Sequence, residues 1–190
     1  MADPHFFGYG SLVNRATHTY DDARPARLSG WRRQWRHTSL RDVAYLTVTP
    51  ASGHAIDGLI AAVPNGDWAA LDLREAAYDR LHVPPETIRH DHDQVISVQV
   101  YKTRAAHDAA PTVRHPILHS YLDTVVSGYF QVFGRDGAAG FFASTDGWGA
   151  PVLNDRADPR YPRTTPLSAE MRRLIDAMLD DLGVSRIASD

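Results

Sequence analysis

The chain opens with the stretch His5-Phe6-Phe7-Gly8-Tyr9-Gly10-Ser11-Leu12, in which an aromatic run leads directly into small residues. The aromatic run is typical of a short buried strand, and the small residues after it are typical of a tight turn. Gly8 and Gly10 allow the backbone to approach a ligand closely or to adopt a positive φ. Successive N–H groups in such a turn can bind an anion or an oxyanion. The stretch therefore predicts a strand that ends in a candidate anion-binding turn, Tyr9-Gly10-Ser11-Leu12.

Four more segments of the first half have the alternation or the β-branched content of strands. They comprise residues 26–38, 44–49, 54–63 and 95–101. In the first of them, arginines alternate with Leu28, Trp31 and Trp35, which predicts a solvated arginine face opposite a buried apolar face. An alternating strand of this kind is not the clustered basic surface that nucleic-acid binding requires.

The second half of the chain has helical periodicity instead. Residues 116–133, 138–144 and 167–182 are expected to form helices, and residues 146–166, rich in Pro, Gly and Arg, a long loop. Strands followed by helices are typical of an α+β fold. We therefore expect a single domain over residues 1–190, in which a small mixed or antiparallel β-barrel is flanked by helices.

The composition limits the classes of protein to which the chain can belong. It has 190 residues, 43% of them hydrophobic, which suits one globular domain. It has no cysteine, which excludes disulfides, thiolate nucleophiles and cysteine-based metal sites. The net charge of −3 argues against a nucleic-acid partner. The lack of an apolar run of about 20 residues argues against a membrane partner. Because residues 1–4 lack the features of a signal peptide, we expect a cytoplasmic protein, of undetermined oligomeric state.

Glu75 stands out because the chain uses glutamate at only three positions. A helix is expected over residues 68–78, and Trp68, Leu71, Glu75 and Tyr78 follow one another at spacings of three, four and three. Residues at these spacings share one face of a helix. Since the other three members are large and apolar or aromatic, we expect Glu75 to project inward.

An inward carboxylate must be paired or neutralised, because burial of an unpaired charge is costly. One interpretation is a structural ion pair with an arginine such as Arg80 or Arg41. The other is a catalytic general acid/base, whose pKa would be raised by an apolar environment. The pattern alone leaves both open.

Taken together, these segments resemble the γ-glutamylcyclotransferase superfamily, which includes AIG2-like proteins. The turn looks like the family's signature loop, and the segment after it looks like the strand that follows this loop in the family. Two further segments look like the strand and helix that deliver the family's catalytic glutamate. The last looks like a helix whose tyrosine faces the substrate. In chain order, the matching segments are Phe7-Gly8-Tyr9-Gly10-Ser11-Leu12, Leu28-Ser29-Gly30-Trp31-Arg32-Arg33, Gly58-Leu59-Ile60-Ala61-Ala62-Val63, Leu71-Asp72-Leu73-Arg74-Glu75-Ala76-Ala77-Tyr78 and residues 116–128, with Tyr121. The resemblance covers roughly residues 5–130.

The resemblance implies a reaction and a role for each matching residue. The α-amine of a γ-glutamyl group attacks its own γ-carbonyl, so that 5-oxoproline forms and the attached amine, amino acid or peptide is released. Glu75 would be the general acid/base, and Tyr9, Gly10, Ser11 and Leu12 would hold the substrate through backbone N–H groups. Tyr121 would close one side of the pocket. No cofactor and no metal is implied.

The chain also departs from the family's pattern. Many members have an asparagine directly after the serine, whereas Leu12 follows Ser11 here and Asn14 comes later. The motifs of the glutathione-specific branch are not found, so glutathione is not assigned as the substrate. Residues 146–190 have no counterpart in the family, and the arginines of the loop would either clamp an acidic part of the substrate or pin the loop to the barrel.

Two other functions and one other site remain open. The fold could serve as a non-catalytic small-molecule binding module, or Glu75 could activate water in an amide hydrolase. A metal site at His90-Asp91-His92-Asp93 is the less favoured interpretation, because no third ligand is tied to the two histidines by spacing. We expect a solvated polar connection there.

Overall fold

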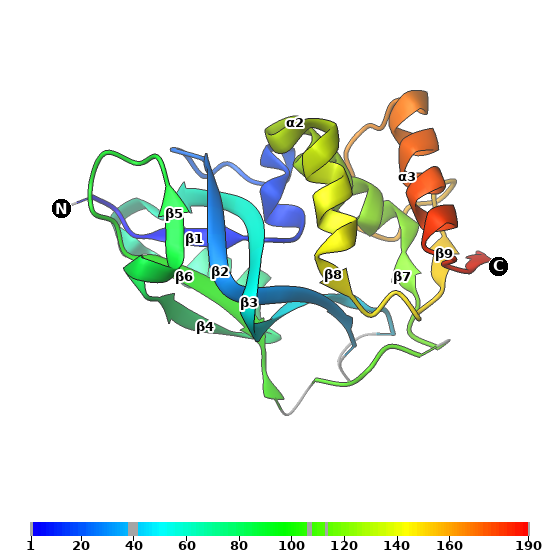
Figure 1. The fold of residues 1–190 in the computed structure, drawn as a ribbon, viewed down its shortest axis with the longest axis horizontal. Helices are drawn as coiled ribbons and strands as arrows, with labels where there is room; N and C mark the ends of the chain where they lie inside the picture. Colours follow the sequence, from blue (N-terminus) through cyan, green and yellow to red (C-terminus); the bar gives the residue numbers. More distant parts are fainter. Residues whose placement is uncertain (1, 38–41, 106–107, 113, 190) are drawn as a thin grey trace.

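The computed structural model describes residues 2–37, 42–105, 108–112 and 114–189. Its main sheet has the strand order β4-β6-β1-β3-β2-β5, and a short strand, β8, adds to β2. β1 pairs with β6, and β2 with β8, in parallel, whereas the other neighbours are antiparallel. The strands are β1 (His5–Gly8), β2 (Arg24–Arg36), β3 (Tyr45–Ala62), β4 (Tyr78–Val83), β5 (Ile88–His90), β6 (Val98–Thr103) and β8 (Thr145–Asp146). The sheet curls into an open half-barrel (Figure 1), which confirms the predicted mixed α+β fold.

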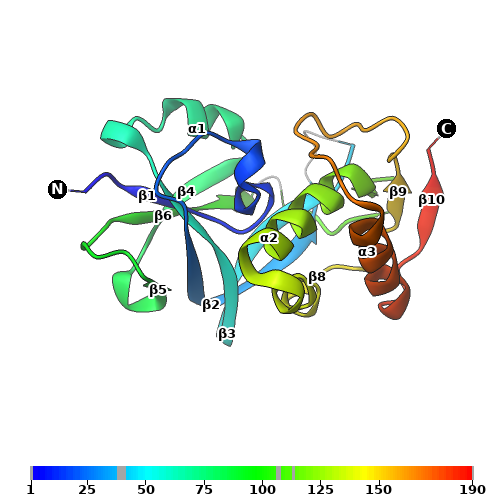
Figure 2. The same cartoon turned by 90° about the horizontal axis from the view of Figure 1, so that it is seen from above.

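The helices and a second sheet form the other side of the molecule. The helices are α1 (Ala69–Arg74), α2 (His119–Ala143) and α3 (Ala169–Asp181), with 3-10 turns η1 (Ser11–Val13), η2 (Arg15–Thr17), η3 (Pro64–Gly66) and η4 (Pro85–Thr87). The second sheet is parallel, in the order β10-β9-β7, from β7 (Ile117–Leu118), β9 (Val152–Asn154) and β10 (Arg186–Ala188). Figure 2 shows α2 between the main sheet and α3.

Several predicted boundaries are wrong in an instructive way. The two strands expected at 44–49 and 54–63 are one strand, β3, because it pairs along its length with β2 despite a shift in register. The two helices expected at 116–133 and 138–144 are one element, α2, interrupted at Gly134. Residues 146–166 are not only a loop, because they contain β9. A strand of three residues is too short to produce a recognisable alternation.

A bulge at Gly30 makes Arg33 an exception to the predicted solvated arginine face of β2, whose other arginines are exposed or partly exposed. The register with β3 shifts between Ser29 and Trp31, and Gly30 has a φ of 83°, a conformation that glycine tolerates. An extra residue reverses which side chains face the core, so that Arg33 points inward and is fully buried. Its Nη1 donates to the Tyr129 hydroxyl at 2.8 Å, and burial lowers the pKa of Arg33.

The core explains how the elements are held together. One apolar cluster runs from Phe7 in β1 through Trp35 and Leu46 to Ile175 in α3. On the other face of β1, Phe6 packs in a separate cluster with Leu71 of α1, so that α1 is anchored to the outside of the sheet. None of the helices in the described part of the chain combines the length and apolar character needed to cross a membrane.

Candidate active site

The turn after β1 is tight because another element packs against it, and not because it has a positive φ. Gly10 caps η1 with φ of −117°, so the positive φ allowed by the sequence is absent at this glycine. A Cβ at Gly10 would lie only 2.9 Å from the Tyr121 hydroxyl of α2. Val13 N–H donates to Gly10 and Asn14 N–H to Ser11, whereas the Ser11 and Leu12 N–H groups bond no acceptor within the described residues. Two donors of the turn are therefore available to a ligand.

The turn is held in place by hydrogen bonds from distant elements. The Tyr9 hydroxyl donates to the carbonyl oxygen of Tyr101 at 2.6 Å. The Tyr129 hydroxyl lies 2.9 Å from the carbonyl oxygen of Tyr9. Asn14 is fully buried, and its Nδ2 donates to the carbonyl oxygen of Thr124 at 2.9 Å. Asn14 therefore has a structural role here, joining the turn to α2.

Glu75 lies at the end of α1, and the helix is shorter than predicted. The last helical residue is Arg74, and Glu75 is the C-cap, with φ of −102° and ψ of 32°. Tyr78 already belongs to β4, where it pairs with Thr103 of β6. This pairing overrides the helical propensity of the two alanines after Glu75. Glu75 and Tyr78 therefore do not share a helix face, yet both face the same cavities, and the Glu75 side chain is 18% exposed.

Arg74 is the charged neighbour of Glu75, which the sequence analysis missed. Its Nε lies 3.3 Å from Glu75 Oε1, and its Nη2 donates to Ser11 Oγ at 3.3 Å. Residues adjacent on a continuous helix diverge by about 100°, but here the helix ends between them, so both side chains reach the cavity. Arg80, one of the predicted partners, instead pairs with Asp72 at 3.0 Å. The other predicted partner, Arg41, lies outside the described residues.

Tyrosines form the remaining walls around Glu75. Tyr78 donates its hydroxyl to the carbonyl oxygen of Leu46 at 2.8 Å. Burial raises the pKa of Tyr9, Tyr78 and Tyr121, and the negative charge of Glu75 raises each further. These hydroxyls are therefore neutral hydrogen-bond donors at any physiological pH.

Two cavities meet at these residues. The inner cavity, of about 40 Å³, is lined by the turn after β1 together with Tyr101. The outer cavity, of about 700 Å³, opens between α1, the start of α2 and a loop of the C-terminal half. Four residues line both cavities: Ser11, Glu75, Tyr78 and Tyr121. All the site residues predicted from the sequence line the inner cavity, and three of them, Ser11, Glu75 and Tyr121, also line the outer one.

The outer wall of the outer cavity comes from the long loop within residues 146–166. The sequence analysis left open whether the arginines of this loop clamp the substrate or pin the loop to the barrel. Arg160, Tyr161 and Arg163 line the outer cavity, and Tyr161 packs edge-on against Tyr121 with ring centroids 5.0 Å apart. Among the described residues of that lining, Glu75 is the only acidic one. The loop is far from Glu75 in the sequence, so no local sequence pattern could have predicted that the two lie at the same cavity.

The same loop is pinned by its first residues. Arg156 contacts Asp123 of α2 at 2.7 Å and Asp176 of α3 at 2.8 Å. The fully buried Asp155 accepts from the N–H of Ser120 at 2.8 Å and of Arg160 at 2.9 Å. Arg156 therefore pins the loop, as one of the two interpretations expected, whereas Arg160 lines the cavity and its role as a clamp for the substrate stays a prediction.

Comparison with known proteins gives one family match and a shared fold. Residues 6–120 match the family described as gamma-glutamyl cyclotransferase, AIG2-like. A solved structure named gamma-glutamyl cyclotransferase is 15% identical, with a TM-score of 0.56, over 91% of this chain and 98% of that one. An uncharacterized protein from Homo sapiens is 15% identical, with a TM-score of 0.58, over 93% and 99%. YkqA from Bacillus subtilis is 18% identical, with a TM-score of 0.56, over 72% and 51%. No curated protein sequence matches this chain.

Proposed function

The chain belongs to the gamma-glutamyl cyclotransferase, AIG2-like family, and we propose that it releases 5-oxoproline from a γ-glutamyl compound by intramolecular cyclisation. The observation that carries the proposal is the position of Glu75 at the junction of the inner and outer cavities. A cyclisation of this kind needs a group that can accept and donate protons, placed between the glutamyl part of the substrate and its leaving group. With the glutamyl part in the inner cavity and the leaving group in the outer one, the Glu75 carboxylate would contact both.

The reaction moves two protons in turn from the α-nitrogen to the leaving nitrogen, and one carboxylate can carry both. Glu75 first accepts a proton from the α-ammonium group, which makes the amine nucleophilic. The amine nitrogen forms a bond to the γ-carbonyl carbon, and the carbonyl π electrons move to oxygen. Glu75 then donates the proton to the leaving nitrogen as its bond to carbon breaks and the carbonyl reforms. The ring nitrogen still carries two hydrogens and a positive charge, so it gives its second proton to the Glu75 carboxylate, which passes it to the released amine. The products are a neutral lactam N–H and an ammonium group, and Glu75 is again ionised. Because Arg74 lies 3.3 Å from Glu75 Oε1, it stabilises the ionised carboxylate with which the cycle begins.

The turn after β1 would stabilise the intermediate. The N–H groups of Ser11 and Leu12 can donate to the oxygen that becomes negative, or to the α-carboxylate of the substrate. Tyr121, whose hydroxyl packs over Gly10, limits how far the substrate can move away from the turn. Holding the substrate folded in this way supplies much of the rate, because the nucleophile and the electrophile belong to one molecule.

The outer cavity favours a leaving group that carries a negative charge. Arg74, Arg160 and Arg163 line it, and Glu75 is the one acid among the described residues of its wall. A carboxylate on the released amino acid or peptide complements this charge, whereas a simple amine does not. We therefore expect γ-glutamyl amino acids or peptides to be better substrates than γ-glutamyl amines.

The experiment is a product analysis on a panel of γ-glutamyl amino acids, γ-glutamyl peptides and γ-glutamyl amines. The expected product is 5-oxoproline, formed by the native protein and not by the Glu75→Gln variant. Free glutamate as the product would instead establish an amide hydrolase in which Glu75 activates water. Tight binding of the panel compounds without any product would establish a binding module, and either outcome would overturn the proposal.

A further inference from the structure

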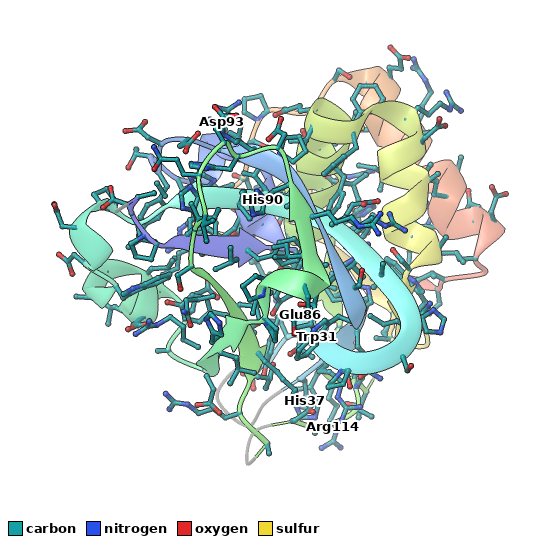
Figure 3. All side chains as sticks on the ribbon, turned by 60° about the vertical axis from the view of Figure 1, so that its left-hand side comes forward. Trp31, His37, Glu86, His90, Asp93 and Arg114 are labelled. Carbon is teal, nitrogen blue, oxygen red and sulfur yellow. The ribbon has the colours of Figure 1, made fainter. Side chains whose placement is uncertain are left out.

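A second group of polar side chains lies at the opposite end of β1 from the candidate active site. His5 is the first residue of β1, Asp22 precedes β2 and His92 follows β5. One nitrogen of each histidine and one carboxylate oxygen of Asp22 all lie within 4.8 Å of one another. Figure 3 labels His90 and Asp93, which flank His92 in the sequence, in the upper half of the view. Three segments far apart in the sequence therefore converge here.

His5 has a buried nitrogen that nothing in the described protein satisfies. The residue is 1% exposed, and its Nδ1 lies 2.9 Å from the carbonyl oxygen of Asp3. A carbonyl only accepts, so Nδ1 carries a hydrogen, and in the neutral imidazole Nε2 then presents a lone pair. Nε2 has no hydrogen-bond partner among the described residues and lies 3.5 Å from Asp22 Oδ2. A buried lone pair without a donor is costly unless something binds it.

Asp22 and His92 supply two more ligand atoms at the same point. His92 Nε2 lies 2.9 Å from Asp22 Oδ2, the oxygen that also faces His5. Arg24 Nε donates to the other oxygen, Asp22 Oδ1, at 2.6 Å and so orients the carboxylate. On its far side, His92 Nδ1 accepts from the N–H of Gln94 at 3.0 Å and lies 3.2 Å from the carbonyl oxygen of Gln94. An ion bound at Nε2 would replace the proton there, and with the ring proton on Nδ1 the imidazole would donate to that carbonyl oxygen. Metal-binding histidines and carboxylates are typically oriented by outer hydrogen bonds of the second kind.

We propose that His5, Asp22 and His92 form a binding site for a divalent transition-metal ion of the Zn²⁺ class. Two imidazoles and one carboxylate are a ligand set that suits Zn²⁺, and they leave a fourth position for water. The Asp22 side chain is 34% exposed, so solvent and an ion have access from that side. The spacing of His90 and His92 alone argued against a metal site, because the two other segments, which carry His5 and Asp22, could not be identified from the sequence.

The bound ion would be structural. It would connect the start of β1 to the segments before β2 and after β5, and His5 is joined to the sheet through its pairing with Ala62 and Val98. An ion that binds only the folded protein raises its stability by mass action. This role is independent of the proposed cyclisation, which uses the other end of β1.

The test is Zn²⁺ titration by calorimetry on chelator-treated protein from which any affinity tag has been removed. We expect one ion per chain, and a melting temperature that rises with Zn²⁺. Asp22→Asn should weaken binding at least tenfold, because loss of an outer partner alone typically weakens metal binding 10–100-fold. Asn tolerates the φ of 49° at this position, so the variant should fold, as circular dichroism would verify. His92→Ala should give the same loss.

Two controls make the result decisive. Asp91→Asn removes a carboxylate from the same rim, 3.9 Å from Arg24, without removing a ligand, and should leave Zn²⁺ affinity within twofold. His115→Ala disrupts the stacked pair of His37 and His115, whose ring centroids are 3.7 Å apart, and should also leave it unchanged. Absence of Zn²⁺ binding, an equal loss in Asp91→Asn, or a loss confined to His115→Ala would overturn the proposal.

Discussion

The two halves of the molecule contribute to the same cavity in different ways. The sheet half provides the turn after β1 and Glu75, and the half from β7 onward provides Tyr121 and the loop with Arg160 and Arg163. The match to the family covers residues 6–120 and so ends just before Tyr121. Under the proposed function, the difference predicts that the chemical step and the choice of leaving group are separable along this chain.

The halves are also stabilised by different interactions. The turn after β1 depends on close backbone packing, since Gly10 lies directly under the Tyr121 hydroxyl. The loop depends on charge, since Arg156 bridges Asp123 and Asp176. Substitutions in the first half should therefore affect every substrate equally, and substitutions in the second half should discriminate among substrates.

Glu75→Gln should have the largest effect. We expect kcat to fall by about 10²–10⁴-fold for every γ-glutamyl substrate, because general acid–base catalysis is lost while the shape of the side chain is kept. The measurement is the steady-state rate of 5-oxoproline formation, with Glu86→Gln, an exposed glutamate in η4, as the matched control. A loss that depends on the leaving group would contradict the separation of the two halves.

Arg156→Ala tests the pinning of the loop. The change leaves Asp123, which is 7% exposed, without its cation, and we expect the free energy of unfolding to fall by about 3 kcal/mol. Urea denaturation measures this, with Arg173→Ala, an exposed arginine of α3, as the control. Under native conditions KM should rise for substrates with an acidic leaving group while kcat stays nearly constant. Equal stability of the two variants would show that charge does not hold the loop.

Gly10→Ala tests the packing of the turn. The added methyl group would lie 2.9 Å from the Tyr121 hydroxyl, so the turn or α2 must shift. A shift of this size can lower kcat/KM by about 10²-fold, because the reacting groups are misplaced. Adding Tyr121→Phe to this variant removes the clashing oxygen and should restore part of the activity. Gly149→Ala, where the methyl group meets open space, should have no effect.

Arg163→Ala tests the charge of the outer cavity. We expect KM to rise about tenfold for a γ-glutamyl amino acid, in line with the loss of one charged hydrogen bond, and to change little for a γ-glutamyl amine. The exposed Arg89 of β5 provides the control, as Arg89→Ala. The same increase in KM for both substrate classes would mean that the cavity does not discriminate between substrates by the charge of the leaving group.

His119 should give the smallest effect, on stability alone. Burial lowers its pKa despite the nearby carboxylates of Asp123 and Asp176, and the cations Arg156 and Arg186 lower it further. The unfolded chain therefore binds this proton at a higher pH than the folded chain does. The free energy of unfolding should fall as pH drops below about 6.5, the value of an unperturbed histidine, and His119→Gln should flatten this dependence. Urea denaturation at a series of pH values measures it, and an unchanged slope in the variant would contradict the assignment.

The sequence predicted most of the long elements in both halves of the fold and missed β4, β5 and the second sheet. The run from His5 to Leu12 predicts both β1 and its turn, because composition and glycine spacing are local properties. The helix expected over residues 68–78 ends at Arg74, because β4 pairs with β6. The second sheet was missed altogether, since each of its strands has only two or three residues.

The sequence by itself therefore determined the α+β class, the family resemblance and six of the residues that line the inner cavity, all of which depend on local pattern and on motif order. Only the tertiary structure decided that Arg74 faces Glu75, that Arg33 is buried after the bulge at Gly30, and that Arg163 reaches the outer cavity. These outcomes depend on where elements end and on the register in which they pair. Both are decided by contacts between segments far apart in the chain, which local periodicity does not record.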